Sequence, residues 1–154
     1  MFGKIKRWMY RGNRPGWIAK ILNAFWGFVH GSGLVAENWV TLEVIGRKSG
    51  KIISFPIVIA SYNGERYVVS MLGKDAQWVK NVHAADGKAY IHRKGRTEIK
   101  LEEIPVSERA PILKTYLQQA PGARPHIPVD KDAPLTEFES VVEDFPAFRV
   151  VVKS

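Results

Sequence analysis

Alternation of apolar and polar residues predicts that most of the chain between residues 39 and 103 forms β-strands. In segment 96–103, Thr97, Ile99 and Leu101 alternate with charged residues, as they do in a strand with one buried face. Asn63-Gly64 is the two-residue sequence that most strongly favours a hairpin turn, so neighbouring strands should be mostly antiparallel. The predicted strands are 39–45, 52–60, 66–72, 88–93, 96–103 and 148–152.

Apolar residues recur at helical spacing in other segments. The first of these, Trp17–Val29, follows Asn13, a residue type that caps helices. A short helix is predicted after Asp75, which could cap it, with Trp78 on its inner face. Two further helices are predicted, over 107–119 and 135–143.

These elements predict a fold of the α+β or mainly β class, a small barrel of about six mostly antiparallel strands with inserted helices. It should form one domain over residues 15–154, after a basic N-terminal segment, 1–14. The proline-rich segment 121–134 is a loop. Pro56 interrupts the second strand, so it should lie at a sheet edge, at a bulge, or where the ladder is open to a ligand.

Charge narrows the range of partners. Lysine and arginine number 23 against 15 acidic residues, so the formal net charge is 23 − 15 = +8. Such a surface attracts nucleic acid, anionic lipid or a multiply charged cofactor. Nucleic acid fits least well, because we find no exposed Phe/Tyr strand motif of the kind that stacks on bases. The four histidines show no ligand spacing with carboxylates, so no metal site is predicted.

The absence of cysteine excludes disulfides and thiolate metal sites, and it fits a reducing cytoplasm. Segment 1–14 mixes five cations with interleaved aromatic residues. We interpret it as a frayed terminus that packs one aromatic side chain on the domain. The alternative is a peripheral contact with the inner face of the membrane.

The segment most suggestive of chemistry is the basic turn, defined as Gly46-Arg47-Lys48-Ser49-Gly50-Lys51, between the first two predicted strands. Its glycines allow a tight reversal, and its backbone N–H groups, hydroxyl and cations could converge on a phosphate. A solvated basic hairpin turn with no ligand is the simpler alternative.

The order of several motifs resembles the deazaflavin-dependent nitroreductase family. These motifs are the basic turn after an apolar strand, Pro56, the Asn63-Gly64 hairpin, and Gly73 followed by Trp78 and Asn81. The resemblance covers nearly the whole chain. It implies a split β-barrel like that of the flavin-mononucleotide-binding relatives of pyridoxamine oxidase. It also implies coenzyme F-420 as the cofactor, whose reduced form delivers hydride.

The resemblance assigns cofactor contacts to matching positions. The basic turn would hold the phosphate and acidic tail of the coenzyme, and Pro56 would lie along the deazaflavin ring. The end of the third strand would approach the ring or the ribityl chain, while Trp78 and Asn81 would close over the cofactor. The implied cofactor-binding residues are Arg47, Lys48, Ser49, Gly50, Lys51, Pro56, Ser70, Met71, Leu72, Gly73, Trp78 and Asn81.

One region departs from the resemblance. Nitro-activating relatives carry a tyrosine-rich stretch after the first C-terminal helix, whereas residues 120–127 here contain no tyrosine. Nitroimidazole activation is therefore not carried over. Arg124 and His126 in this region could bind an anionic or carbonyl substrate and supply a proton, and we predict His126 as the catalytic residue beside the acceptor. The alternative is that both are loop residues that face water.

The predicted function is a deazaflavin-dependent oxidoreductase that passes hydride to a small electron-poor acceptor such as a quinone, an enone or a nitro compound. Two alternatives remain open at this stage. One is an oxidoreductase that binds flavin mononucleotide on the same fold, and the other is a non-enzymatic carrier of cofactor or hydrophobic ligand. The protein could be a monomer or a homodimer.

Overall fold

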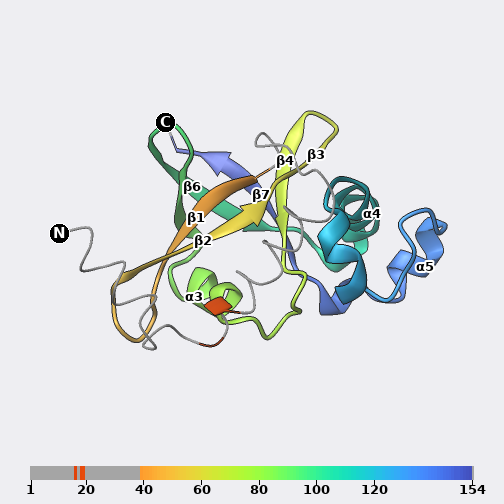
Figure 1. Ribbon diagram of the computed structural model, residues 1–154, viewed down its shortest axis with the longest axis horizontal. Coiled ribbons are helices and arrows are strands. Elements are labelled where there is room, and N and C mark those ends of the chain that lie inside the picture. Colours follow the sequence, from red (N-terminus) through yellow and green to blue (C-terminus); the bar gives the residue numbers. More distant parts are fainter. Residues whose placement is uncertain (1–15, 17, 20–38, 154) are drawn as a thin grey trace.

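The computed structural model describes residues 16, 18, 19 and 39–153 (Figure 1). Of the helix predicted over Trp17–Val29, the described residues Ile18 and Ala19 are helical, and Ile18 is fully buried against the core. The remaining residues of that helix, and segment 1–14, lie outside the described residues. No helix in the described part of the chain is long and apolar enough to cross a membrane.

The strands form one antiparallel seven-stranded sheet in the order β2-β1-β5-β6-β7-β4-β3, which curls into a half-barrel (Figure 1). This confirms the predicted fold class. The strands are β1 Trp39–Ile45, β2 Ile52–Val58, β3 Ala60–Tyr62, β4 Glu65–Val69, β5 Lys88–His92, β6 Arg96–Glu103 and β7 Ala147–Val152.

The seventh strand arises because the predicted strand 52–60 is broken at Ile59. Residues up to Val58 pair with β1, whereas Ala60 begins β3 and pairs with Tyr67 of β4. Val58, Ile59 and Ala60 are all buried, so the alternation of faces is lost where the chain bends between its two partners. Pro56 of β2 pairs with Thr41 of β1. Because β2 is an edge strand, the edge position, one of the three predicted for Pro56, is confirmed.

The helices lie on one side of the curled sheet and at its end (Figure 1). Those in the described part are α3 Gln77–Ala84, α4 Arg109–Gln119 and α5 Leu135–Glu139, with 3-10 turns at Val106–Glu108, Pro121–His126 and Val142–Asp144.

Two details of the helix prediction are wrong. The α3 helix begins after Ala76 with no side-chain cap, so Asp75 does not cap it. The predicted helix 135–143 ends at Glu139, and a separate 3-10 turn follows from Val142 to Asp144. These short elements depend on tertiary contacts more than on local sequence.

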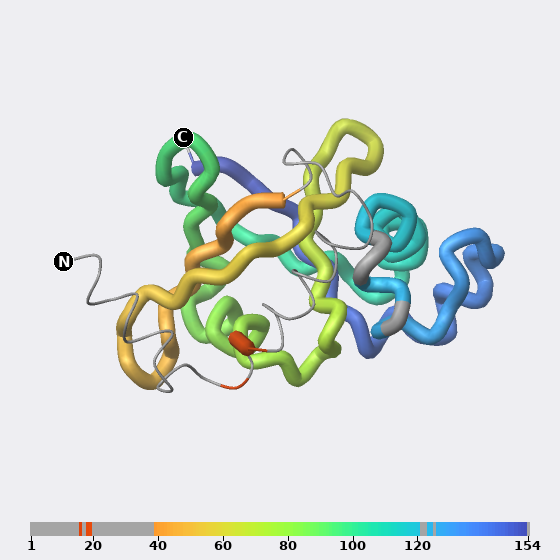
Figure 2. Tube along the Cα trace, viewed as in Figure 1, coloured from red at the N-terminus to blue at the C-terminus, as the bar shows by residue number. Residues whose placement is uncertain are grey.

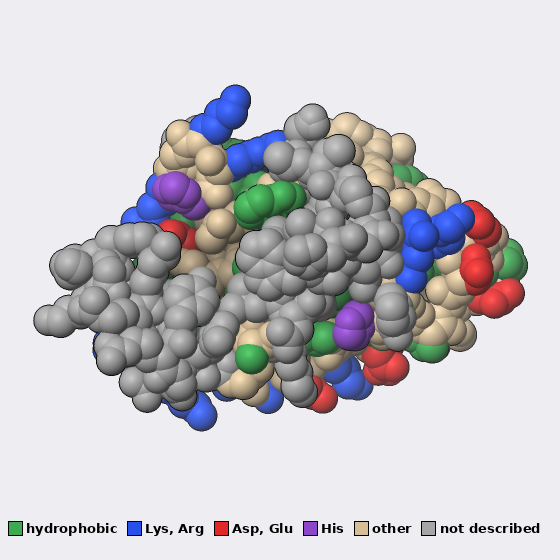
Figure 3. All heavy atoms as spheres, viewed as in Figure 1, with side chains coloured by type: hydrophobic (Ala, Val, Ile, Leu, Met, Phe, Trp, Pro, Cys, Tyr) green, Lys and Arg blue, Asp and Glu red, His purple; other side chains and the backbone are tan. Residues whose placement is uncertain are grey.

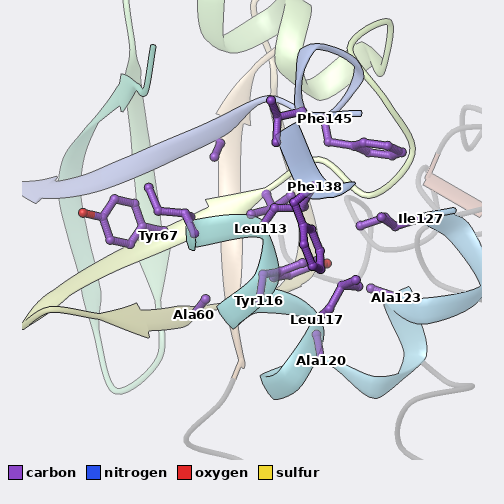
Figure 4. Packing of buried hydrophobic residues seen from close by; sticks show 14 of the residues in the cluster. Ala60, Tyr67, Leu113, Tyr116, Leu117, Ala120, Ala123, Ile127, Phe138 and Phe145 are labelled. Atoms are coloured by element: carbon purple, nitrogen blue, oxygen red, sulfur yellow. The ribbon is translucent and has the colours of Figure 1, made fainter. Parts of the chain in front are cut away.

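The core has two parts. One lies between the sheet and α3 and includes Trp78 and Phe148. The other packs α4 and α5 against the far end of the sheet, and Figure 4 shows Tyr116 and Leu113 of α4 gathered with Phe138 of α5. The two parts hold α3 and the turn Val142–Asp144 in fixed places on the sheet, and these elements carry the site described below.

Candidate functional site

The basic turn closes the hairpin between β1 and β2 by its own hydrogen bonds. The Gly46 N–H donates to the Lys51 carbonyl at 2.8 Å, and the Gly50 N–H donates to the Gly46 carbonyl at 2.8 Å. Gly50 has a φ of 73°, a conformation that glycine adopts without strain. The Ser49 hydroxyl oxygen accepts from the Lys51 N–H at 3.1 Å, so this serine shapes the turn.

The side chain of Arg47 is held in place by two amides of α3. Its Nη1 donates to Asn81 Oδ1 at 2.7 Å, and its Nη2 donates to Gln77 Oε1 at 2.7 Å. Asn81 Oδ1 also accepts from the Arg47 backbone N–H at 3.1 Å. Both partners are uncharged, so they orient the guanidinium without cancelling its positive charge.

The basic turn therefore presents the Arg47 guanidinium in a fixed orientation, with N–H donors that are not used by Asn81 or Gln77. Lys48 and Lys51 are exposed on the same six-residue segment, and that segment contains no acidic residue. Lys48 makes no ion pair with any residue in the described part of the chain. This donor set fits a phosphate with further acidic groups attached, which is the anionic part of coenzyme F-420.

A second constrained turn follows β4. Ser70 is fully buried, its hydroxyl donates to the Gly73 carbonyl at 2.6 Å, and its backbone N–H donates to the Pro146 carbonyl at 2.9 Å. Gly73 has a φ of 105°. The hydroxyl of Ser70 is therefore committed to the turn, and its predicted contact with the coenzyme stays a prediction. The residues that follow Ser70 reach the surface.

Those residues line a pocket of about 390 Å³ beside the start of α3. The lining residues are Met71, Leu72, Gly73, Lys74, Asp75, His126, Asp144 and Phe145. The chain can be followed in Figure 2 from β4 through this loop into α3. The pocket brings His126, predicted on the acceptor side, together with Met71, Leu72 and Gly73, predicted on the cofactor side.

The basic turn and the pocket flank the same end of α3. Gln77, the first residue of this helix, holds Arg47, and Asp75, two positions earlier, lines the pocket. On the face drawn in Figure 3, acidic side chains gather mainly at the end near α5, whereas lysine and arginine side chains are spread more widely. The basic turn and the pocket are thus linked through residues 75–77.

Trp78 lies in the core. Only 3% of it is exposed, and its ring packs between Phe55 and Phe148, with ring centroids 5.9 and 5.6 Å away. It anchors α3 on the sheet, and the predicted contact with a coenzyme would require this packing to shift. Asn81 is also 3% exposed, and its amide oxygen is engaged with Arg47.

Gln77 was not among the residues predicted from the sequence, although its spacing from Asn81 is a signal that points to it. Gln77 and Asn81 are four residues apart, so they lie on one face of α3 and can grip the same side chain. Asp144 and Phe145 were not predicted either. They reach the pocket through the return of the chain to β7, which local sequence does not reveal.

The curled antiparallel sheet places this protein in the class of split-barrel folds. Residues 19–132 match the sequence model of the family described as F420H(2)-dependent quinone reductase. The match spans more than half of the 154 residues, so the chain belongs to this family and the resemblance drawn from its motifs is confirmed. No curated protein is significantly similar to the chain.

Solved structures support the same fold. An F420-H2 dependent reductase is 20% identical, with a TM-score of 0.50, over 73% of this chain and 93% of its own. A domain-swapped dimer is 20% identical, with a TM-score of 0.53, over 88% of this chain and 97% of its own. A protein of unknown function from Agrobacterium tumefaciens is 13% identical, with a TM-score of 0.54, over 76% of this chain and 49% of its own. This chain therefore spans about half the length of the Agrobacterium protein.

Proposed function

We propose that this protein transfers a hydride from reduced coenzyme F-420 to a small electron-poor organic acceptor, a quinone above all. The observation that carries the proposal is the pocket in which Met71, Leu72 and Gly73 meet His126, together with Arg47, whose side-chain partners on α3 are both uncharged. Family membership supports the same choice of cofactor and acceptor. The cysteine-free composition supports a cytoplasmic location.

In this proposal the basic turn binds the phosphate and acidic tail of the coenzyme. Arg47 acts as a pre-oriented donor, because Asn81 and Gln77 fix it before any ligand arrives. Lys48 and Lys51 add further exposed positive charge. Pro56, Leu72 and Gly73 border the deazaflavin ring, since an edge strand and a loop leave space for a flat ligand.

The reduced coenzyme, when bound, supplies a hydride with both of its electrons. The residues of the chain orient the acceptor and transfer a proton to it after reduction. Met71, Leu72 and Phe145 give the pocket an apolar surface for a flat ring, and His126, another lining residue, is exposed to solvent. An imidazole is suited to pass one proton from water to the reduced acceptor near neutral pH.

A binding titration tests the choice of cofactor. The purified protein is titrated with coenzyme F-420 and, in parallel, with flavin mononucleotide, and binding is followed by quenching of tryptophan fluorescence. The proposal predicts saturable binding of coenzyme F-420 at a much lower concentration than flavin mononucleotide, because only the former carries an acidic tail beyond its phosphate. Tighter binding of flavin mononucleotide would favour the alternative flavin.

Replacing His126 by alanine should lower kcat for quinone reduction by about tenfold or more, as expected when a general acid is removed. The dissociation constant of coenzyme F-420 should stay unchanged, because His126 lies in the pocket and not at the basic turn. The matched control is His92→Ala, at an exposed position on β5 that does not line the pocket. Equal kcat values for the wild type and His126→Ala would remove the proton-transfer role.

A further inference from the structure

We infer that Lys74 is a binding residue for negative charge that develops on the acceptor, a role that rests on the function proposed above. Lys74 is the only lysine or arginine among the described residues that line the pocket. Its ammonium lies 3.6 Å from Asp144 Oδ1, beyond the usual range of a hydrogen bond, and the two side chains are 53% and 63% exposed. The pair is therefore weak, and the ammonium donors are available to a ligand.

The backbone at Lys74 is well fixed. The turn before it is closed in both directions, since Ser70 Oγ donates to the Gly73 carbonyl and the Gly73 N–H donates to the Ser70 carbonyl at 3.2 Å. The Ser70 N–H joins this turn to Pro146, just before β7. The lysine thus sits on a rigid base at the pocket, as a residue that must meet a defined atom should.

Reduction of the acceptor produces an anion that the Lys74 ammonium could stabilise. When a quinone accepts a hydride, it gains one hydrogen nucleus and two electrons, while the coenzyme is oxidised by two electrons. The reduced ring then carries a negative charge on an oxygen, and that oxygen takes one proton to complete the hydroquinone. An ammonium beside the oxygen stabilises the anion before the proton, relayed from water through His126, arrives.

The two aspartates at the pocket lower its affinity for anions, which gives a second substitution with an expected effect opposite to that at Lys74. Asp144 and Asp75 both line the pocket and oppose negative charge there. Removing the charge of Asp144 should therefore strengthen the binding of an anion, whereas removing the charge of Lys74 should weaken it. Two substitutions at one pocket with opposite expected effects are difficult to explain by a general loss of structure.

The test measures ligand binding without the coenzyme. Two matched probes are used: naphthoquinone, which is neutral, and hydroxynaphthoquinone, whose acidic hydroxyl is ionised at neutral pH and imitates the anionic product. Dissociation constants are measured by calorimetry for the wild type, Lys74→Gln, Lys74→Arg, Asp144→Asn and the control Lys80→Gln. Lys80 is exposed on α3 and does not line the pocket.

Lys74→Gln should raise the dissociation constant of hydroxynaphthoquinone by about tenfold, the usual scale for a hydrogen bond to a charged group. The value for naphthoquinone should stay unchanged. Lys74→Arg should restore most of the anion affinity, Asp144→Asn should increase it, and Lys80→Gln should leave it as in the wild type. The same Lys74→Gln change should lower kcat with reduced coenzyme F-420 more than it raises KM for the quinone.

Equal anion affinity in the wild type and Lys74→Gln would overturn the inference, as would equal losses in Lys74→Gln and Lys80→Gln. Failure of either probe to bind the wild type would also overturn it. The proposed function fails in a different way, if the wild type oxidises no reduced coenzyme F-420 with any quinone. The binding arm contains no coenzyme, so the two failures are distinguishable.

Discussion

Replacing Asn81 by aspartate should weaken the binding of coenzyme F-420 by about tenfold or more while the protein stays folded. The aspartate can accept the same two hydrogen bonds from Arg47, at the positions where Asn81 Oδ1 now accepts at 2.7 and 3.1 Å. It also adds a negative charge against the guanidinium. The geometry of the turn is retained, but the charge that attracts phosphate is cancelled.

The matched control is Asn63→Asp, which adds the same charge to an exposed turn between β3 and β4. Asn63 has a φ of 51°, a conformation that aspartate also tolerates. Isothermal titration of both variants at low and moderate salt separates a local effect from a change in overall charge. If Asn81→Asp binds as tightly as the wild type, or if both variants lose the same affinity, Arg47 does not bind the coenzyme phosphate.

The largest loss of stability is expected for Arg109→Met. Arg109 is 6% exposed, and its guanidinium donates to the Ile104 carbonyl at 2.8 Å, the Val142 carbonyl at 3.0 Å and Glu103 Oε2 at 2.9 Å. Methionine fills similar space but leaves these acceptors without their donor. The free energy of unfolding should fall by about 3 kcal/mol, since each buried polar group left unpaired costs about 1–3 kcal/mol.

Urea unfolding followed by circular dichroism measures this change, and an unchanged m value shows that the same surface is exposed on unfolding. Arg149→Met is the control, because Arg149 pairs with Glu102 at 2.6 Å but both side chains are well exposed, at 39% and 38%. It should destabilise the protein far less. A loss for Arg109→Met as small as that of the control would mean that this network does not hold α4 to the turn at Val142.

The loss at Arg109 also bears on the site. Its contact with Val142 fixes the beginning of the 3-10 turn that ends at Asp144, and Asp144 and Phe145 form one wall of the pocket. The buried arginine thus links the stability of the C-terminal half to the shape of the acceptor site. At the level of sequence it was only a polar position early in a predicted helix.

The sheet was predictable because alternation and turn residues are local signals. The register of β1 with β2 follows from the turn between them. Pro56 limited its strand to an edge, a bulge or an open ladder, and β2 lies at the edge. The break at Ile59 was not predictable, because it depends on which strand each half of the segment pairs with. Local sequence likewise did not show where the helix after Pro134 ends.

The site was predictable in part for the same reason. The basic turn is one continuous segment, so the sequence alone predicted that its cations lie together. Its link to α3 depends on a contact between Arg47 and Asn81, 34 residues apart. Trp78 and Asn81 were correctly placed on one helix, but that helix turns them toward the core and toward Arg47. The pocket joins three separated segments, and only the fold brings them together.

The central claim, hydride transfer from reduced coenzyme F-420 to a quinone, is tested most directly by a single-turnover experiment without oxygen. The wild-type protein is loaded with reduced coenzyme F-420, mixed with one equivalent of a quinone, and followed by the absorbance of the oxidised deazaflavin. We expect one equivalent of oxidised coenzyme and one of hydroquinone, at a rate far above that of the same mixture without protein. An unaccelerated reaction, with the coenzyme demonstrably bound, would contradict the account.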